Sequence, residues 1–594
     1  MNHVLMNQLL KNQLGKFLPP IALVLVLAAG LCSCASSPAA PDTAPPSGSA
    51  DEIAQGQEEA RIPRDFPAEE PQGLPQEEPV VPPTVEPGRE PNYAEARPSS
   101  IDRNELVVAF SSGEMELDFR KSYMANEAQL FTAIYEGLFS YHPITMEPIL
   151  AAASRWVTSE DKKQWTFTIR ENSRFSNGDP IRAEDFRAAW LSLLEPTRNS
   201  PYSSLFDIIE GARDYRLGRL PASRVGISAP NGRTLVVRLN SPAAYFPSML
   251  CHHSFSPVHP SMLNNEKWEK PVSNGPFQID EINSERIILV RNGSYWDAGR
   301  VLLNKLTIRF SEDGDHSADM WNRGEARWIQ GEVNFDALRD RSGIEVNVMF
   351  STHYYFIRSA RKPWNDHRLR RALSLVVPWD EIRQGFSMPA KTLIYPIPNY
   401  PEIEGLYKTD AEEAKALLIE AGYPGGVGLP ELVIRITPSL DAEFIALQMA
   451  RAWYEVLGVP VKIDVVPYGQ YQQSLQRDDY DVGSTTWIGD FADPYTFLQM
   501  WQRDSNLNEA RHDDSDFEAL IEKSMTEEGT ERWKTLAEAE ELLLARGNVL
   551  PITFNPAINI INTNEIDGWY PNVLDIHPFK YMYIKARQPL PGVV

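Results

Sequence analysis

Two aspartates in one short segment are the side chains best suited to do chemistry. Asp490 follows a strand-like run that ends in Trp487–Gly489, and Asp493 directly precedes Pro494, which is typical of a turn. A carboxylate in apolar surroundings is costly unless a cation meets it. If no side chain supplies that cation, a ligand ammonium group can. The alternative is that Asp490 pairs internally or caps a helix that starts near Pro494.

The other candidate groups do not assemble into a catalytic or metal site. Cys251–His253 resembles a metal cluster, but three adjacent residues cannot all face one ion from a strand, and no CxxC, HxxxH or HExxH pattern adds ligands. The sequence has no Walker A loop, GxGxxG or GxSxG motif, and no nucleophile–base pair can be assembled. We therefore expect no enzyme activity, metal or cofactor. The net charge of −24 also argues against nucleic-acid binding.

The first residues predict export and lipid attachment. Two lysines precede an uncharged apolar run over 17–30, which is too short and wrongly flanked for a spanning helix. Residues 31–34, Leu-Cys-Ser-Cys, resemble the bacterial lipobox, and Cys34 fits as the lipidated residue because a small residue precedes it. This predicts a signal peptide over 1–33 and a lipid anchor, palmitate among its acyl chains. Lipidation at Cys32 and a plain cleaved signal are the alternatives.

Residues 34–102 predict a disordered tether. Prolines punctuate a stretch that is rich in Glu, Ala, Ser and Gln and poor in aromatic and β-branched residues, so no core can form. Fully stretched at ~3.1 Å per residue, the tether would reach roughly 200 Å. A proline-rich recognition segment is the alternative. With Cys34 lipidated, only Cys251 remains in the body, so no intrachain disulfide is expected.

The body, from about residue 103 onward, is too long for one core and alternates strand and helix patterns. A capping box at Thr409–Glu412 opens an expected helix that Gly422 closes, and a second helix runs through Phe444, Leu447, Ala450, Trp453 and Leu457. This alternation predicts an α/β fold with sheets covered by helices. Strands are expected at 106–110, 165–170, 234–239, 286–290, 432–437 and 459–466, and at 480–482 leading into the Asp490 segment.

Several segments, in this order and spacing, resemble the oligopeptide-binding branch of the extracellular solute-binding proteins of peptide ABC transporters. The longest runs from a strand through a turn at Asn177-Gly178 to a helix cap before Glu184-Asp185. The segments that carry the resemblance are 150–156, 165–170, 175–186, 200–202, 274–277, 291–296, 362–366 and 368–374.

The resemblance implies a two-lobed periplasmic-binding-protein fold of type II, of the large peptide-binding class, with an extra small domain. Its lobe I would comprise 103–135, 260–350 and 558–594. The small domain would cover 136–259, and lobe II 351–557. A ligand would lie between the lobes and be buried when they close.

The resemblance also implies the ligand-binding residues. In peptide-binding relatives an aspartate after a Trp-x-x pattern, here Asp490, meets the α-ammonium group of an extended peptide held by strand-like hydrogen bonds. The other residues that the resemblance assigns to the ligand are Trp487, Ile488, Gly489, Thr486 and Thr485 from the second lobe, Tyr123, Ala125 and Asn126 from the first, and Tyr202. Close relatives also carry an arginine for the peptide's carboxylate. Here Ser484 takes its position, and Arg358 and Arg477 are possible replacements.

We therefore expect a monomeric, lipid-anchored receptor on the periplasmic side of the cell membrane or at the cell surface. It would bind short peptides and hand them to an inner-membrane ABC permease. Two alternatives stay open. One is an orphan sensory or surface-interaction lipoprotein on the same fold, and the other is a relative that binds a non-peptide amine, nickel or haem.

Overall fold

The computed structural model describes residues 105–111, 115–265, 268–311, 313–386 and 388–585. The predicted signal peptide, the lipidation site at Cys34 and the tether over 34–102 lie outside these ranges. Within them, no helix combines the length and apolar character that crossing a membrane requires.

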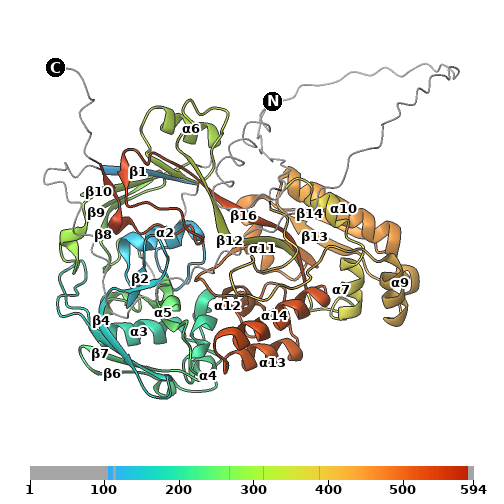
Figure 1. Ribbon diagram of the computed structural model, residues 1–594, viewed down its shortest axis with the longest axis horizontal. Helices are drawn as coiled ribbons and strands as arrows, with labels where there is room; N and C mark the ends of the chain where they lie inside the picture. Colours follow the sequence, from blue (N-terminus) through green and yellow to red (C-terminus); the bar gives the residue numbers. More distant parts are fainter. Residues whose placement is uncertain (1–104, 112–114, 266–267, 312, 387, 586–594) are drawn as a thin grey trace, which may run out of the picture. The chain divides into compact units, whose positions relative to one another are not determined.

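A ten-stranded mixed sheet is the largest element of the fold (Figure 1). In spatial order its strands are β14 (Val461–Val465), β13 (Leu432–Ile436), β15 (Val482–Ile488), β12 (Ile344–Ile357), β16 (Val549–Ile561), β11 (Trp328–Gln330), β1 (Glu105–Phe110), β10 (Lys305–Phe310), β9 (Arg286–Arg291) and β8 (Phe277–Ile282). The two long strands β12 and β16 pair antiparallel in the middle of the sheet, with register shifts after Val348 and His353. β15 pairs antiparallel with β12 along its whole length, from Val482 to Ile488.

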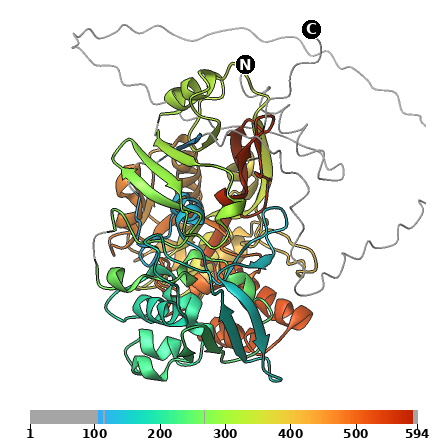
Figure 2. The same ribbon diagram turned by 90° about the vertical axis from the view of Figure 1, so that its left-hand side faces the viewer.

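A second, four-stranded antiparallel sheet forms within residues 153–238. Its order is β4 (Ala153–Thr158), β5 (Gln164–Ile169), β7 (Thr234–Arg238) and β6 (Ile227–Asn231). Helix α3 (Ala183–Leu193) packs on β6 and β7, and both views show it beside this sheet (Figures 1 and 2). The buried rings of Phe186 and Trp190 lie on α3, and the Asp185 carboxylate accepts a hydrogen bond from the Arg182 N–H at 2.7 Å, which caps the helix.

The remaining elements are two antiparallel pairs of short strands and the covering helices. The pairs are β2 (Phe139–Tyr141) with β3 (Pro148–Leu150), and β17 (Ile566–Asp567) with β18 (Tyr583–Ile584). The other helices are α2 (Ala125–Ile134), α4 (Ala212–Arg216), α5 (Phe246–Met249), α6 (Gly314–Asn322), α7 (His367–Ser374), α8 (Trp379–Arg383), α9 (Ala411–Glu420), α10 (Leu440–Leu457), α11 (Tyr468–Leu475), α12 (Tyr495–Leu498), α13 (Ser515–Ser524) and α14 (Gly529–Ala545). Helices α7, α8, α9 and α10 share a core with β13 that includes Trp364, Trp379 and Trp453.

The predicted α/β class and the predicted strands are confirmed, and two details of the helices are corrected. Asp410, not Thr409, caps α9, because its carboxylate accepts the backbone N–H groups of Glu412 and Glu413. Helix α10 forms as expected, but Phe444 and Leu447 are 43% and 57% exposed. The buried residues of α10 are Ala442, Ile445, Ala446, Met449, Trp453 and Leu457, so Trp453 and Leu457 of the expected pattern do face the core. The predicted domain boundaries stay predictions.

Candidate ligand-binding site

A cavity of about 860 Å³ opens where the Asp490 segment meets several distant parts of the chain. Its volume falls in the range of roughly 300–1,000 Å³ that is typical of small-ligand sites. Its wall is rich in aromatic and polar side chains. The lining segments include Tyr123–Ala125, Phe139–Tyr141, Pro201–Tyr202, Cys251–His253, Thr485–Asp490 and Ser505–Arg511.

Strand β15 and the turn after it bring Asp490 to this cavity. The Gly489 N–H donates to the Phe350 carbonyl at 2.8 Å, which extends the contact with β12 one residue beyond the strand. A Cβ atom at position 489 would lie 2.5 Å from Cδ1 of Phe350, so only glycine fits there without a shift. The Asp490 N–H then donates to Oγ1 of Thr496 at 2.9 Å, which fixes the direction of the turn.

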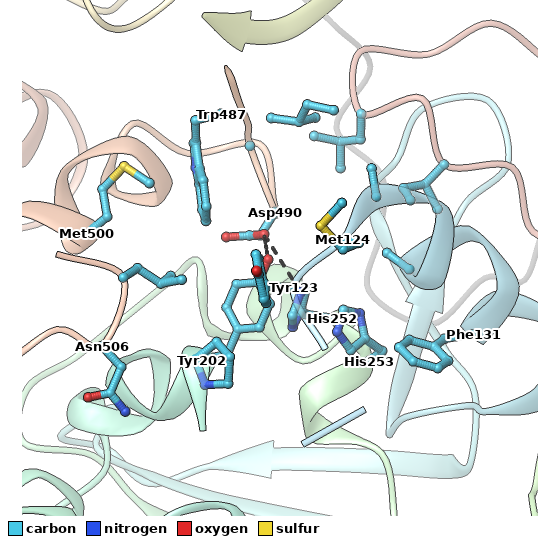
Figure 3. A pocket seen from close by; sticks show the side chains of 18 of the residues that line it. Tyr123, Met124, Phe131, Tyr202, His252, His253, Trp487, Asp490, Met500 and Asn506 are labelled. Atoms are coloured by element: carbon cyan, nitrogen blue, oxygen red, sulfur yellow. Dashed lines mark hydrogen bonds and ion pairs between the residues drawn. The ribbon is translucent and has the colours of Figure 1, made fainter. Parts of the chain in front are cut away.

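The Asp490 carboxylate is buried and hydrogen-bonded, but no cationic side chain of the described residues pairs with it (Figure 3). It accepts hydrogen bonds from Tyr202 Oη at 3.0 Å, Thr496 Oγ1 at 3.1 Å and Gln499 Nε2 at 3.2 Å. All three bonds favour the ionised form, but burial outweighs them and raises the pKa of Asp490 to about 7. The cavity wall therefore holds a carboxylate that is only partly ionised at neutral pH.

The nearest basic group to Asp490 among the described residues is a neutral histidine. Nε2 of His252 lies 3.7 Å from the Asp490 carboxylate, and burial lowers the pKa of His252 to about 3. No described lysine or arginine comes within 4.0 Å of Asp490. Asp493, in contrast, pairs with the buried Arg532 at 2.7 Å and accepts the Tyr495 N–H at 3.0 Å. The alternative of internal pairing and helix capping therefore describes Asp493 rather than Asp490.

The structure brings nearly all of the predicted site residues to one cavity. Those in its wall are Tyr123, Ala125, Tyr202, Thr485, Thr486, Trp487, Ile488, Gly489 and Asp490. Asn126 is not among the lining residues, because its side-chain amide turns towards Met115 Sδ at 3.4 Å. This is the one member of the predicted set that the fold directs elsewhere.

Sequence reasoning missed four residues that contact Asp490, of which Thr496 and Gln499 lie close to it in the chain. Tyr141 Oη donates to the Asp490 carbonyl at 3.2 Å, and His252 approaches its carboxylate. Tyr141 and His252 both come from the segment 136–259, so only the tertiary fold brings them to Asp490. In the sequence, the run Cys251–His253 was the feature that could have pointed to His252 as a site residue. It lines the cavity, and the described residues hold no cluster of three or more metal-ligating side chains.

The two candidate arginines for a ligand carboxylate lie elsewhere. Arg358 pairs with Asp478 at 2.5 Å and Arg477 with Asp479 at 3.5 Å, and neither lines the cavity. We correct that expectation accordingly. In the described wall, the lysine and arginine side chains are those of Lys580, which pairs with Glu136 at 3.0 Å, and Arg511.

Comparisons with known proteins place the chain among bacterial binding proteins. A family model described as "Bacterial extracellular solute-binding proteins, family 5 Middle" matches residues 146–509. The chain is 30% identical over 435 residues to the oligopeptide-binding protein OppA of Bacillus subtilis, which covers 69% of this chain and 80% of the relative. It is 28% identical over 508 residues to the periplasmic oligopeptide-binding protein OppA of Salmonella typhimurium, with 82% and 92% covered.

Solved structures confirm the predicted two-lobed periplasmic-binding-protein fold. The murein tripeptide binding protein MppA of Escherichia coli superposes with a TM-score of 0.71 at 25% identity, covering 82% of this chain and 99% of that one. The unliganded open form of an MppA murein tripeptide-binding protein gives only 0.58 at the same identity, with 82% and 98% covered. The present conformation is therefore less similar to that open form.

Proposed function

Because the chain belongs to the bacterial extracellular solute-binding proteins of family 5, we propose that it captures short peptides between two closing lobes and delivers them to an ABC permease for uptake. The relatives named as oligopeptide-binding proteins support this substrate class. The family consists of binding proteins rather than enzymes, so the cavity serves capture and release.

The observation that carries the proposal is the Asp490 carboxylate without a cation. A peptide's α-ammonium group is a compact cation with three N–H donors, and a buried carboxylate that already has neutral donors lacks only that charge. The cost of burying Asp490 in the empty protein would be offset when the ligand arrives. In this proposal Tyr202 and His252 orient the carboxylate, and Trp487 flanks the first peptide residue.

The exposed edge of β15 supports binding of an extended chain. β15 meets β13 only at the pair Ile434–Val482, whereas β12 covers the other edge along its whole length. From Thr485 to Ile488 the edge facing away from β12 has no strand partner among the described residues, and these residues line the cavity. An extended peptide can add there as a strand, so that main-chain hydrogen bonds supply affinity without requiring a sequence.

Calorimetric titration of the full chain with trialanine and N-acetyl-trialanine tests this function. We expect trialanine to bind with micromolar or tighter affinity and the acetylated peptide not to bind, because acetylation removes the cation. Asp490→Ala should abolish or strongly weaken binding, whereas Asp380→Asn, at an exposed position on α8, should not change it. Equal binding of both peptides, or unchanged affinity in Asp490→Ala, would refute the assigned role.

The lipid anchor and the permease belong to the same proposal. The Leu-Cys-Ser-Cys run at 31–34 supports a lipid at Cys34. Mass spectrometry of the mature amino terminus should find acyl chains on Cys34, and Cys34→Ala should release the protein from the membrane fraction. An unmodified amino terminus would contradict the anchor but not the peptide site. Peptide uptake that does not require the protein would contradict the delivery role.

A further inference from the structure

A second carboxylate in the cavity wall, that of Glu509, has no hydrogen-bond or ion-pair partner among the described residues. Glu509 lies in the loop between the short helix at 499–501 and α13, and it is half-buried. Its backbone N–H donates to the Leu507 carbonyl at 2.9 Å. No hydrogen bond or ion pair joins its carboxylate to any residue that the structure describes.

The arginines near Glu509 are engaged elsewhere. Arg358 directs its guanidinium to Asp478 and to the Arg477 carbonyl, at 2.5 and 2.9 Å, and Arg511 donates to the Asn508 carbonyl at 3.1 Å. Their charges favour the ionised form only weakly, and burial raises the pKa of Glu509 to about 7. Glu136, another acid of the cavity wall, has a direct partner in Lys580. Neither Glu509 nor Asp490 has a lysine or arginine partner among the described residues, and of the two Asp490 alone has hydrogen-bond donors.

The surroundings of Glu509 suit a long cationic side chain. Tyr123 and Tyr354 line the same cavity as Glu509, and burial, and then the charge of Glu509, raise the pKa of both. Aromatic faces pack against methylene groups and attract cations. Oε1 of Gln472, another lining residue, is buried without a hydrogen-bond partner and is available to accept an N–H group.

Glu509 and Asp490 lie near opposite ends of β15, and neither belongs to the strand itself. The Ser359 N–H donates to the Ala510 carbonyl at 2.9 Å, which puts the loop that carries Glu509 beside the end of β12 that pairs with the start of β15, whereas Asp490 follows the end of β15. Tyr354, which also lines the cavity, pairs with Thr485, three residues before the end of β15, so roughly 10 Å of strand at about 3.3 Å per residue lies between Thr485 and the turn that carries Asp490. A peptide anchored at Asp490 by its amino terminus would therefore reach Glu509 with a later residue.

We propose that Glu509 forms a subsite for a basic side chain, so that the cavity selects peptides with a lysine-like or arginine-like residue after the first. This inference rests on the proposed peptide-binding function. It adds that the preferred ligand carries a second positive charge besides its α-ammonium group. Glu509 supplies the carboxylate, Gln472 an additional acceptor, and Tyr123 and Tyr354 the walls along the methylene groups.

Titrations with position-matched peptides test the subsite. Ala-Lys-Ala and Ala-Ala-Lys are compared with the same peptides carrying norleucine, which matches the length of lysine without its charge, and with trialanine. We expect wild type to favour lysine over norleucine by about tenfold or more at one of these positions, as a charged hydrogen bond warrants. Glu509→Gln should reduce the ratio to within about twofold while trialanine affinity is retained, and Glu431→Gln, at an exposed position, should leave it unchanged.

The outcomes separate the subsite from the function on which it rests. A lysine preference that survives in Glu509→Gln, or no preference in wild type while trialanine binds, would overturn the subsite and leave peptide binding intact. Failure of every peptide to bind the wild type would overturn both.

Discussion

The affinity for trialanine should fall steeply between pH 7 and pH 5, and Asp490→Asn should abolish this dependence. The peptide's ammonium group, with a pKa of about 8, stays protonated throughout this interval. His252, whose pKa burial lowers to about 3, stays neutral. Asp490 is the contacting group that changes charge, because burial raises its pKa to about 7 in the empty protein.

The expected size of the effect follows from that pKa. At pH 7 about half of the empty sites carry an ionised Asp490, and at pH 5 about one in a hundred does, so the affinity should drop roughly 50-fold. Asp490→Asn should weaken binding at pH 7 by about 2–5 kcal/mol, or roughly 30-fold to several thousand-fold, since the ammonium group is left buried without a counter-charge. The remaining weak binding should vary little with pH.

Titration calorimetry at pH 5, 6, 7 and 8 measures both effects. Glu509 is the complicating group, because its pKa is also about 7. Glu509→Gln serves as the control and should keep the decrease in affinity. A decrease of the same size in Asp490→Asn, or constant affinity in wild type from pH 5 to 7, would refute the ionisation argument.

Three other measurements concern the buried charges and the glycine before Asp490. The folded pKa of Asp490 lies above its unfolded value of about 3.9, so the empty wild type should lose up to roughly 4 kcal/mol relative to Asp490→Asn as pH rises from 4 to 8; urea unfolding at both values checks this. Arg532→Met should cost about 3–5 kcal/mol in the same assay, because it leaves Asp493 buried and unpaired, and adding Asp493→Asn should restore part of the loss. Gly489→Ala should reduce trialanine affinity, since the added methyl group meets Phe350 and displaces Asp490; unchanged affinity would contradict this.

The strands could be predicted from sequence because their patterns are local. Trp165–Ile169 alternates buried and half-buried residues, as its pattern indicates for β5. The buried face of α10 could not be derived as reliably, because apolar residues occupy more than one side of that helix. Phe444 and Leu447 follow a helical period as well as Ile445 and Met449 do, and only packing against the sheet decides between them.

The candidate site was predicted where one continuous segment supplies it. Thr485–Asp490 is such a segment, and the family resemblance pointed to it directly. The family resemblance also assigned Tyr202 to the site, but Tyr141 and His252 could not be read in the same way, since they lie more than two hundred residues from Asp490 and meet it only in three dimensions. Glu509 carries no local motif, and its role rests on the absence of a partner.

The contacts between Asp490 and the segment 136–259 would couple an opening of the cavity to the uptake or release of a proton. Tyr202, Tyr141 and His252 all approach Asp490 from that segment, and they contribute to the burial that raises its pKa. If opening separates them, the carboxylate meets water and its pKa returns towards about 3.9. At neutral pH an empty receptor would then take up protons each time it closes and release them when it opens or binds an ammonium group. The pH of the surrounding medium would thereby set the fraction of empty receptors that are closed.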